Sequence, residues 1–150
     1  MAPDEKDTIS DERDVERALI RLARAMDDRD WAQVSNIIAE DATGDLGTGP
    51  LQGRTAIIEL IRGFLDTCGA TQHLLGNILV DVSGDHATSR AYVHDLHLSS
   101  RSPELTFHTL GDYHDRWERR SGQWRLVERI KQNRASVGSM EVFRSGEGIA

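Results

Sequence analysis

The first part of the chain repeats apolar residues every three or four positions, which is the spacing of an amphipathic helix. Charged residues fill most other positions of a stretch whose apolar members are Val15, Leu19, Leu22 and Met26. Ser10, followed by two acidic residues, is typical of a helix start. The pattern predicts a helix from residue 10 to about residue 26, preceded by eight polar and frayed residues.

Two further helices are predicted before residue 66. Asp30 offers an N-cap, with Gln33 three positions later, for a short amphipathic helix that begins at Trp31. The segment RTAIIELIRGFL predicts a third helix, with a core-facing side made of Ile57, Leu60, Ile61 and Phe64. Between these two helices, DATGDLGTGPLQG is rich in Gly, Asp and Thr, which is typical of a loop or a short edge strand.

Beyond residue 70 the pattern changes to that of β-strands. Four long segments are strand-like: HLLGNILVDV, HATSRAYVHDLHL, LTFHTLGDYHDRWER and QWRLVERIKQN. Their connections, SGD, SSRSPE and RRSGQ, carry the residues of hairpin turns. This order predicts an α+β fold, with three N-terminal helices packed on a curved antiparallel sheet of four long strands plus a short edge strand. We expect a single domain, with a core at about 10–134 and an extension over 135–150.

Charge and composition exclude several classes of function. The chain has 25 acidic and 18 basic residues, a net charge of −7, and no basic run with interleaved aromatic residues, which disfavours nucleic acid as a partner. The single cysteine, Cys68, has no partner for an internal disulfide, and no apolar run reaches the length of a membrane span. Without a signal peptide at its start, the chain is expected to be cytoplasmic.

Three segments resemble the SnoaL-like proteins of the nuclear transport factor 2-like superfamily. MDDRDWAQVSNIIAEDAT is similar to the segment that joins two helices, and TQHLLGNILVDVSGDHATSRAYV is similar to the central hairpin. GDYHDRWERRSGQWRLVERI resembles the last hairpin, with its Gly-x-Trp-Arg turn. Together they extend over the chain from residue 26 to residue 130. The resemblance implies a cone-shaped α+β barrel with a pocket between the helices and the sheet.

Within this superfamily, the chain is most similar to the branch that contains scytalone dehydratase and hexachlorocyclohexane dehydrochlorinase. Members pair a histidine at the start of the first long strand with an aspartate at the end of the first helix, and His73 and Asp27 match these positions. Arg129 matches an arginine that the dehydrochlorinase places in its pocket. The two tyrosines with which scytalone dehydratase holds a water have no match, since the tyrosines here are Tyr92 and Tyr113.

The matched histidine and aspartate suit proton transfer. A neutral imidazole accepts a proton from carbon or oxygen near neutral pH, provided that a carboxylate fixes its tautomer and stabilises the imidazolium. The alternative is that backbone groups satisfy His73, and that Asp27 or its neighbour Asp28 is only a solvated carboxylate at a helix end.

Arg129 is expected on a strand, at the same parity as Arg125 and Val127. It is therefore either a cation in the pocket or one member of a basic row that faces solvent. In a pocket, its charge would stabilise a leaving anion or a developing enolate.

Strand alternation adds candidates for the pocket wall. One face of HATSRAYVHDLHL carries small residues first and then Asp95 and His97, as the wall of a cone-shaped pocket requires. The alternative is that this end of the strand emerges into solvent. Trp31, Asp45 and Phe64 complete the predicted set of substrate-binding residues.

The histidine spacing predicts no metal site. His94 and His97 lie three apart on a strand and point to opposite faces, whereas His108 and His114 share a face but lie about 20 Å apart. The sequence has no His-x-x-x-His pair, Cys/His cluster, phosphate-binding glycine loop or nucleophile elbow. No cofactor is therefore expected, and Cys68 is expected to be a small buried residue.

Together with the resemblance, these residues predict a cofactor-independent lyase, such as a dehydratase, that acts on a small, largely apolar molecule. His73 is the predicted general base and Asp27 its orienting partner. The alternatives are an isomerase or polyketide-cyclase-like enzyme of the same fold, and a non-catalytic ligand-binding or accessory module. The uncovered face of the sheet, with Tyr92, Tyr113 or Trp117, is expected to become buried in a homodimer or homotrimer.

Overall fold

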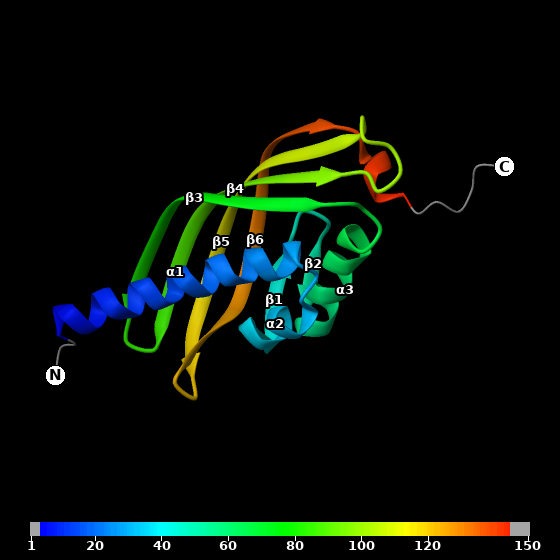
Figure 1. Cartoon of the computed structure of the whole chain (residues 1–150). Helices are drawn as coiled ribbons and strands as arrows, with labels where there is room; N and C mark the ends of the chain where they lie inside the picture. Colours follow the sequence, from blue (N-terminus) through cyan, green and yellow to red (C-terminus); the bar gives the residue numbers. More distant parts are fainter. Residues whose placement is uncertain (1–3, 145–150) are drawn as a thin grey trace.

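Three helices lie against one face of a bent sheet of six strands (Figure 1). This computed structural model describes residues 4–144. The helices are α1 (Glu5–Asp27), α2 (Trp31–Ile37) and α3 (Arg54–Leu65). The strands are β1 (Ile38–Asp45), β2 (Pro50–Gln52), β3 (Thr71–Ser83), β4 (His86–Leu98), β5 (Thr106–Arg120) and β6 (Gln123–Gly138), and a 3-10 helix, η1 (Met140–Phe143), follows them.

The helix α1 begins at Glu5, so the expectation of a frayed segment up to residue 8 is wrong within the described residues. The side chain of Asp4 accepts a hydrogen bond from the backbone N–H of Lys6. Acidic residues in the first turn also stabilise the helix through its dipole. The predicted apolar stripe is buried: Val15, Leu19, Leu22 and Met26. The predicted cap of α2 is also present, because Asp30 Oδ1 accepts from the Gln33 N–H at 3.1 Å.

The strand order is β2-β1-β6-β5-β4-β3, so the sheet is open, with β2 and β3 at its edges. All neighbours are antiparallel except β1 and β6, which are parallel. The predicted α+β fold is confirmed, with a mixed sheet in place of an antiparallel one. The segment expected as a loop or short strand contributes both β1 and β2, because Gly47 and Gly49, at φ 100° and 117°, let the chain fold back.

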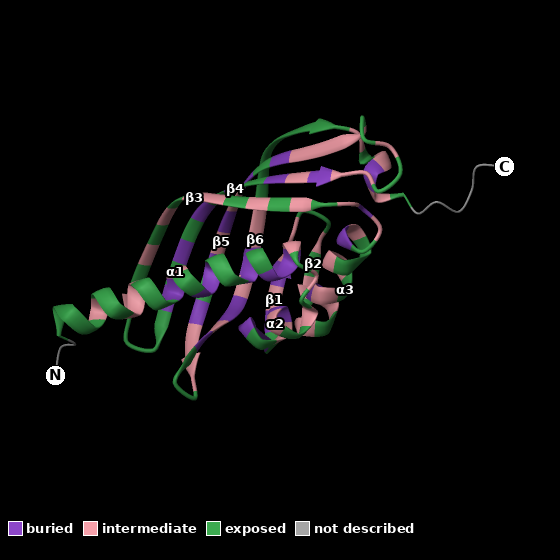
Figure 2. Cartoon of the chain, in the orientation of Figure 1, coloured by how far each residue is buried: buried purple, intermediate pink, exposed green. Residues whose placement is uncertain are grey.

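Burial alternates along the strands, and the buried side faces the helices (Figure 2). On β4 this side carries Ala87, Ser89, Ala91, Val93, Asp95 and His97, all buried as the alternation predicted. Tyr113 and Trp117 lie on the same side, opposite Ala91 and Ala87, so the expectation that they face outward is wrong. The small β4 residues leave the space that these two aromatic rings fill.

Irregularities in the strands bend the sheet and change which residues face inward. In β6, Leu126 pairs with Trp117 and Glu128 pairs with Arg116, so Val127 is the extra residue of a β-bulge. Residue parity therefore changes at Val127. With unbroken alternation, Arg129 would face outward in a row with Arg125. Because of the bulge, it faces the concave side.

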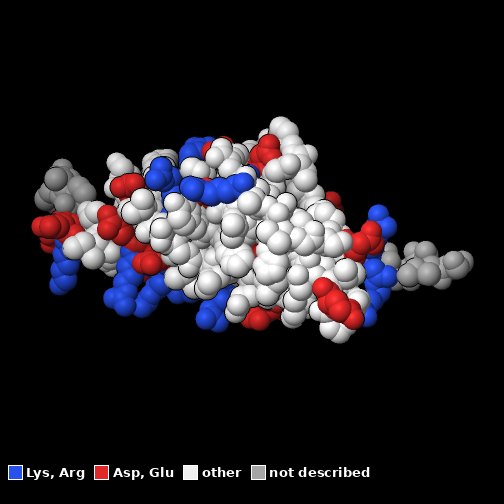
Figure 3. Space-filling view, turned by 90° about the horizontal axis from the view of Figure 1, so that it is seen from above, with Lys and Arg blue, Asp and Glu red and all other residues white. Residues whose placement is uncertain are grey.

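The convex face of the sheet carries exposed apolar residues. Those with large side chains are Leu74, Leu79, Tyr92, Leu110 and Val137. Seen from above, the centre of the surface is largely uncharged, and charged residues lie at its two ends and along both of its edges (Figure 3). The five exposed apolar residues named above, Leu74, Leu79, Tyr92, Leu110 and Val137, are called the convex apolar patch below.

The expected extension is partly regular structure. Strand β6 continues to Gly138, and η1 then turns back, so that the Val142 side chain is buried and the Thr67 hydroxyl donates to the Phe143 carbonyl oxygen at 2.9 Å. The Phe143 ring contacts Phe64 edge to face, with centroids 5.1 Å apart. Residues 145–150 of the expected extension lie outside the described residues.

None of the described helices combines the length and the apolar character that a membrane-spanning segment needs.

The close approach of Gly138 to Thr106, just before η1, predicts that a side chain at this position destabilises the fold. Gly138 has φ 102°, and a Cβ atom there would collide with the carbonyl oxygen of Thr106. We expect Gly138→Ala to lower the free energy of unfolding by roughly 1–3 kcal/mol or more, measured by urea denaturation. Gly84→Ala is the control, because Gly84 has φ 62° with no atom nearby to collide. Equal losses in the two variants would contradict a steric role for Gly138.

Candidate active site

A cavity of about 430 Å³ lies between the helices and the concave face of the sheet. Such a volume is typical of a site for a small molecule. The helices contribute apolar side chains, including Leu22, Met26, Leu60, Ile61 and Phe64. The predicted core face of α3 is therefore largely a cavity wall. Most polar groups come from the strands: His73, Asp95, His97, Thr109, Tyr113, Arg129, Lys131, Asn133, Arg134 and Ser136.

His73 and Asp27 are in direct contact. His73 Nδ1 lies 2.6 Å from Asp27 Oδ1, and the His73 backbone N–H donates to Asp27 Oδ2 at 2.9 Å. The Thr71 hydroxyl donates to Asp27 Oδ1 at 2.9 Å. These bonds hold the last residue of α1 against the start of β3, where the side chains of His73 and Asp27 are only 7% and 17% exposed.

The environment of Asp27 determines the tautomer of His73. Burial would raise the pKa of Asp27, but the hydrogen bonds from His73 and Thr71 outweigh it and hold this pKa below its usual value. An ionised carboxylate only accepts, so neutral His73 carries its proton on Nδ1. Its Nε2 lone pair is then free for a molecule in the cavity.

Arg29 supports this pair from behind, and sequence reasoning missed it. Its guanidinium donates to the Thr71 hydroxyl at 2.8 Å, and Thr71 in turn donates to Asp27. Further bonds go to the carbonyl oxygens of Met26, Asp27, Leu65 and Gly69. Arg29 has φ 56°, a conformation uncommon outside glycine, and no local pattern in the sequence signals it.

Asp95 forms a second polar group in the wall. The Lys131 ammonium donates to Asp95 Oδ2 at 2.6 Å and to the Thr109 hydroxyl at 2.9 Å. Both the backbone N–H and the hydroxyl of Thr109 donate to Asp95 Oδ1. Burial would raise the pKa of Asp95, but Lys131 and Thr109 lower it below its usual value. Sequence reasoning missed Lys131, although it lies two residues after Arg129 at the same parity.

His97 is a neutral imidazole in this setting. Burial lowers the pKa of His97, the charge of Lys131 adds to this effect, and Asp95 only partly opposes it. Its Nδ1 lies 3.2 Å from the Phe107 carbonyl oxygen, which can only accept. The proton is therefore on Nδ1, and Nε2 is left as an acceptor. The expected alternative, a strand end in solvent, does not hold for Asp95 or His97, since both are buried.

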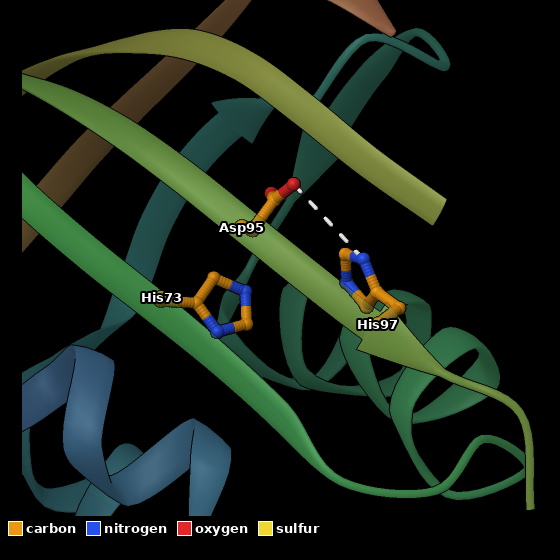
Figure 4. Close-up of side chains that lie close together, drawn as sticks. All are labelled: His73, Asp95 and His97. Atoms are coloured by element: carbon orange, nitrogen blue, oxygen red, sulfur yellow. Dashed lines mark ion pairs between the residues drawn. The ribbon is translucent and has the colours of Figure 1, made fainter. Parts of the chain in front are cut away.

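His73, Asp95 and His97 come together from β3 and β4 (Figure 4). Each offers a ligand atom, and these atoms lie within 4.8 Å of one another, so the three residues form a possible metal-binding group. The spacing argument missed it because it compared histidines along single strands, whereas His73 pairs with Asp95 across two strands. Both Asp95 oxygens already accept hydrogen bonds, and the Lys131 ammonium would repel a dication.

Arg129 lies in the cavity wall as part of a buried ion pair. Its Nε and Nη2 donate to the two Asp115 oxygens at 2.9 and 2.8 Å, and its guanidinium stacks on the Tyr113 ring at 3.8 Å. Burial opposes its charge, but Asp115 keeps the pKa of Arg129 above its usual value. Burial also raises the pKa of Tyr113, which stays a neutral phenol.

Two predicted substrate-binding residues do not line the cavity. The Trp31 ring packs at the edge of the core, with the Arg62 guanidinium over it at 5.4 Å. The Asp45 carboxylate accepts from the backbone N–H groups of Gly47 and Gly49, so it organises the turn after β1. Phe64 does line the cavity, as predicted.

Comparison with known proteins gives the family. The model of the SnoaL-like domain matches residues 7–130, and the resemblance predicted from the sequence is confirmed. No curated protein matches the chain.

Solved structures share the fold along nearly the whole chain. A Novosphingobium aromaticivorans protein provisionally named a scytalone dehydratase is 22% identical, with 97% of this chain and 99% of that chain covered and a TM-score of 0.82. Another from that organism, provisionally named an aromatic ring hydroxylase, is 24% identical, with coverages of 91% and 98% and a TM-score of 0.81. Hexachlorocyclohexane dehydrochlorinase LinA-type3 from Novosphingobium barchaimii is 16% identical, with coverages of 91% and 95% and a TM-score of 0.79. At these identities the likeness establishes the fold, and the three names stand for different reactions.

The hydrogen bonds of Asp27 predict how acid affects stability. The pKa of Asp27 is lower in the folded protein than the value of 3.8 for an isolated side chain. The ionised carboxylate therefore stabilises the fold above that pH, and this contribution is lost as the pH falls through the lower folded pKa. We expect the stability difference between the wild type and Asp27→Asn to shrink between about pH 5 and about pH 3, measured by urea denaturation.

Asp28→Asn is the matched control, because Asp28 is exposed and its carboxylate receives no hydrogen bond within residues 4–144. The same acid-dependent change in this variant would show that Asp27 has no special role in stability.

Proposed function

This chain belongs to the family of SnoaL-like domains, and within that family we propose that it is a lyase that acts on a small, largely apolar molecule. The observation that carries the proposal is the 2.6 Å contact between His73 Nδ1 and Asp27, with Nε2 of the same ring free in the wall of an apolar cavity. Names among the fold neighbours, a dehydrochlorinase and a provisional dehydratase, favour elimination over isomerisation.

In this proposal His73 is the general base. Its Nε2 takes a proton from a substrate carbon, and the Asp27 carboxylate stabilises the imidazolium that forms. The electron pair of the broken C–H bond forms the new carbon–carbon double bond, and the leaving group departs with its own bonding pair. If the leaving group is hydroxide, the imidazolium returns its proton to give water.

The remaining polar groups bind and orient in this proposal. His97 Nε2 accepts a hydrogen bond from a substrate hydroxyl. Arg129 uses two nitrogens on Asp115, so its Nη1 is the nitrogen that remains to meet a leaving anion. The apolar side chains of α1 and α3 exclude water, which strengthens each of these interactions.

Charge balance in the wall supports a neutral substrate. Lys131 is paired with Asp95, Arg129 with Asp115, and Arg134, which also lines the cavity, with Asp112. Asp27 is left as a negative charge beside the His73 ring. The wall thus carries no excess positive charge for an anionic substrate, and the negative charge of Asp27 is balanced when His73 takes up a proton.

Turnover of 5-nitrobenzisoxazole tests the proposed base. This small aromatic molecule loses one C–H proton to a base and opens to a coloured phenolate without any cofactor. We expect the wild type to accelerate the opening and His73→Gln to lose nearly all of this activity. We expect Asp27→Asn to lose about 10²- to 10⁴-fold in kcat. The double variant should be scarcely worse than His73→Gln, because Asp27 acts through His73.

His86→Gln is the matched control, since the side chain of His86 is 74% exposed and lies outside the cavity. Equal activity in wild type and His73→Gln would overturn the proposed base. Binding of the probe without turnover in the wild type would favour a ligand-binding module.

We also propose that copies of the chain associate through the convex apolar patch. Large exposed apolar residues that gather on one sheet face mark association surfaces, and here His94 lies between Leu74 and Leu110 and the Arg134 guanidinium lies over the Tyr92 ring. We expect sedimentation at micromolar concentration to give a dimer or trimer of the 16.8 kDa chain. Leu110→Lys, at the middle of the patch, should shift the mass to that of a monomer, because a charge would be buried at the interface.

Ile20→Lys controls for the added charge, since Ile20 is an exposed apolar residue on α1. A monomeric wild type would refute association, and dissociation by Ile20→Lys but not by Leu110→Lys would place it on another surface.

A further inference from the structure

The Lys131 ammonium has more donors than its neighbours use. It carries three N–H groups, of which one goes to Asp95 and one to Thr109. Across residues 4–144, the third N–H has no hydrogen-bond partner. The side chain is 12% exposed and lines the cavity, so the unused donor belongs to a group that faces the ligand space.

Lys131 is held at a fixed place relative to His73. His73 pairs with Asp95 across β3 and β4, and Asp95 pairs with Thr109 across β4 and β5. The side chains of all three point to the concave side, and Lys131 binds the second and the third. The proposed base and the ammonium therefore approach the same carboxylate from two sides, and one small molecule is able to meet both.

Packing alone does not account for this group. A buried ion pair is rarely more stable than apolar residues of the same volume, because both charges lose their hydration. Here the pair lies in the cavity wall beside Thr109, where apolar side chains in place of both Lys131 and Asp95 would fill the same volume without that cost. Lys131 is also unsuited as a nucleophile, since its Nζ is held by hydrogen bonds to Asp95 at 2.6 Å and to Thr109 at 2.9 Å.

We propose that the Lys131 ammonium, positioned by Asp95 and Thr109, binds a carbonyl oxygen of the substrate and stabilises the negative charge that this oxygen gains during the reaction. This inference rests on the proposed function and names its substrate class: neutral carbonyl compounds with a removable proton on the carbon next to the carbonyl group. Lys131 is then a catalytic residue in addition to His73.

The electron balance follows from the two positions. His73 Nε2 takes the proton from the carbon next to the carbonyl group, and the C–H bonding pair moves to form an enolate. Its oxygen accepts the third N–H of Lys131. The electron pair of the enolate then forms the carbon–carbon double bond as the bond to the leaving group breaks. The leaving group keeps the two electrons of the bond that breaks. Lys131 only donates a hydrogen bond in these steps. The product is a neutral unsaturated carbonyl compound.

Two probes of nearly the same shape separate charge stabilisation from packing. 4-Nitrophenolate carries an oxyanion on an aromatic ring, and nitrobenzene is the same ring without it. We measure the dissociation constants of both by calorimetry, at a pH at which the phenol is ionised. The ratio is the dissociation constant of nitrobenzene divided by that of 4-nitrophenolate, and it measures the preference of the site for the oxyanion.

The test variant is Lys131→Met combined with Asp95→Asn, because the single change would leave a buried carboxylate unpaired. We expect the dissociation constant of 4-nitrophenolate to rise roughly 10- to 100-fold, as for the loss of a hydrogen bond to a charged group. The constant of nitrobenzene should change by less than about threefold. Lys131→Arg should keep most of the preference for the phenolate, because it keeps a positive donor.

The chain has one other lysine, Lys6 in the first turn of α1, and Lys6→Met is the matched control. An unchanged ratio in the test variant, or an equal loss for both probes, would overturn the role of Lys131. The ratio does not depend on proton transfer, so it separates the two proposals. Loss of turnover in His73→Gln, together with an unchanged ratio in the Lys131→Met, Asp95→Asn variant, refutes only the Lys131 inference. Full turnover in His73→Gln, together with a lowered preference for the phenolate in the Lys131→Met, Asp95→Asn variant, refutes only the proposed base.

Discussion

The Asp27 carboxylate joins the end of the longest helix to the first residues of β3, and the cavity depends on this junction. Three donors, from the backbone and ring of His73 and from the Thr71 hydroxyl, offset the cost of placing a charge where water has little access. The same bonds set the angle of the His73 ring. Structural attachment and the proposed chemistry thus meet in one carboxylate, and Arg29 extends the junction to the end of α3 through the Leu65 carbonyl oxygen.

The same constraint, that buried polar groups need partners, explains the rest of the cavity wall. Lys131 with Asp95 and Arg129 with Asp115 are ion pairs between strands of one sheet. Each pair cancels its own charge, so polar side chains enter an apolar wall without an electrostatic field that would attract ions of one sign. In the proposed function, their unused hydrogen-bonding groups are the features that distinguish one neutral ligand from another.

Local patterns in the sequence predicted what depends on local forces. The caps of α2, the stripe of α1 and the alternation along β4 follow from side chains within a few residues of one another, and so does the placing of His73 at the start of a strand. Arg129 shows the limit. Its orientation depends on the bulge at Val127, where one extra residue reverses the parity of everything after it. The grouping of Asp95 with Lys131 crosses three strands, and no spacing along the chain contains that information.

Aromatic rings close one end of the cavity, and this bears on how a substrate would lie. Phe143 contacts Phe64, Phe107 and His97 edge to face, with centroids 4.9 to 5.6 Å apart. A ring or alkyl group of the substrate is best buried among these faces, since they offer apolar area and few hydrogen bonds. His97, at the border of this cluster, presents Nε2 between the aromatic end and the row formed by His73, Asp95 and Thr109. A molecule with its apolar part at Phe143 therefore directs its polar part to His73 and Lys131, which is the orientation that proton removal beside a carbonyl group requires.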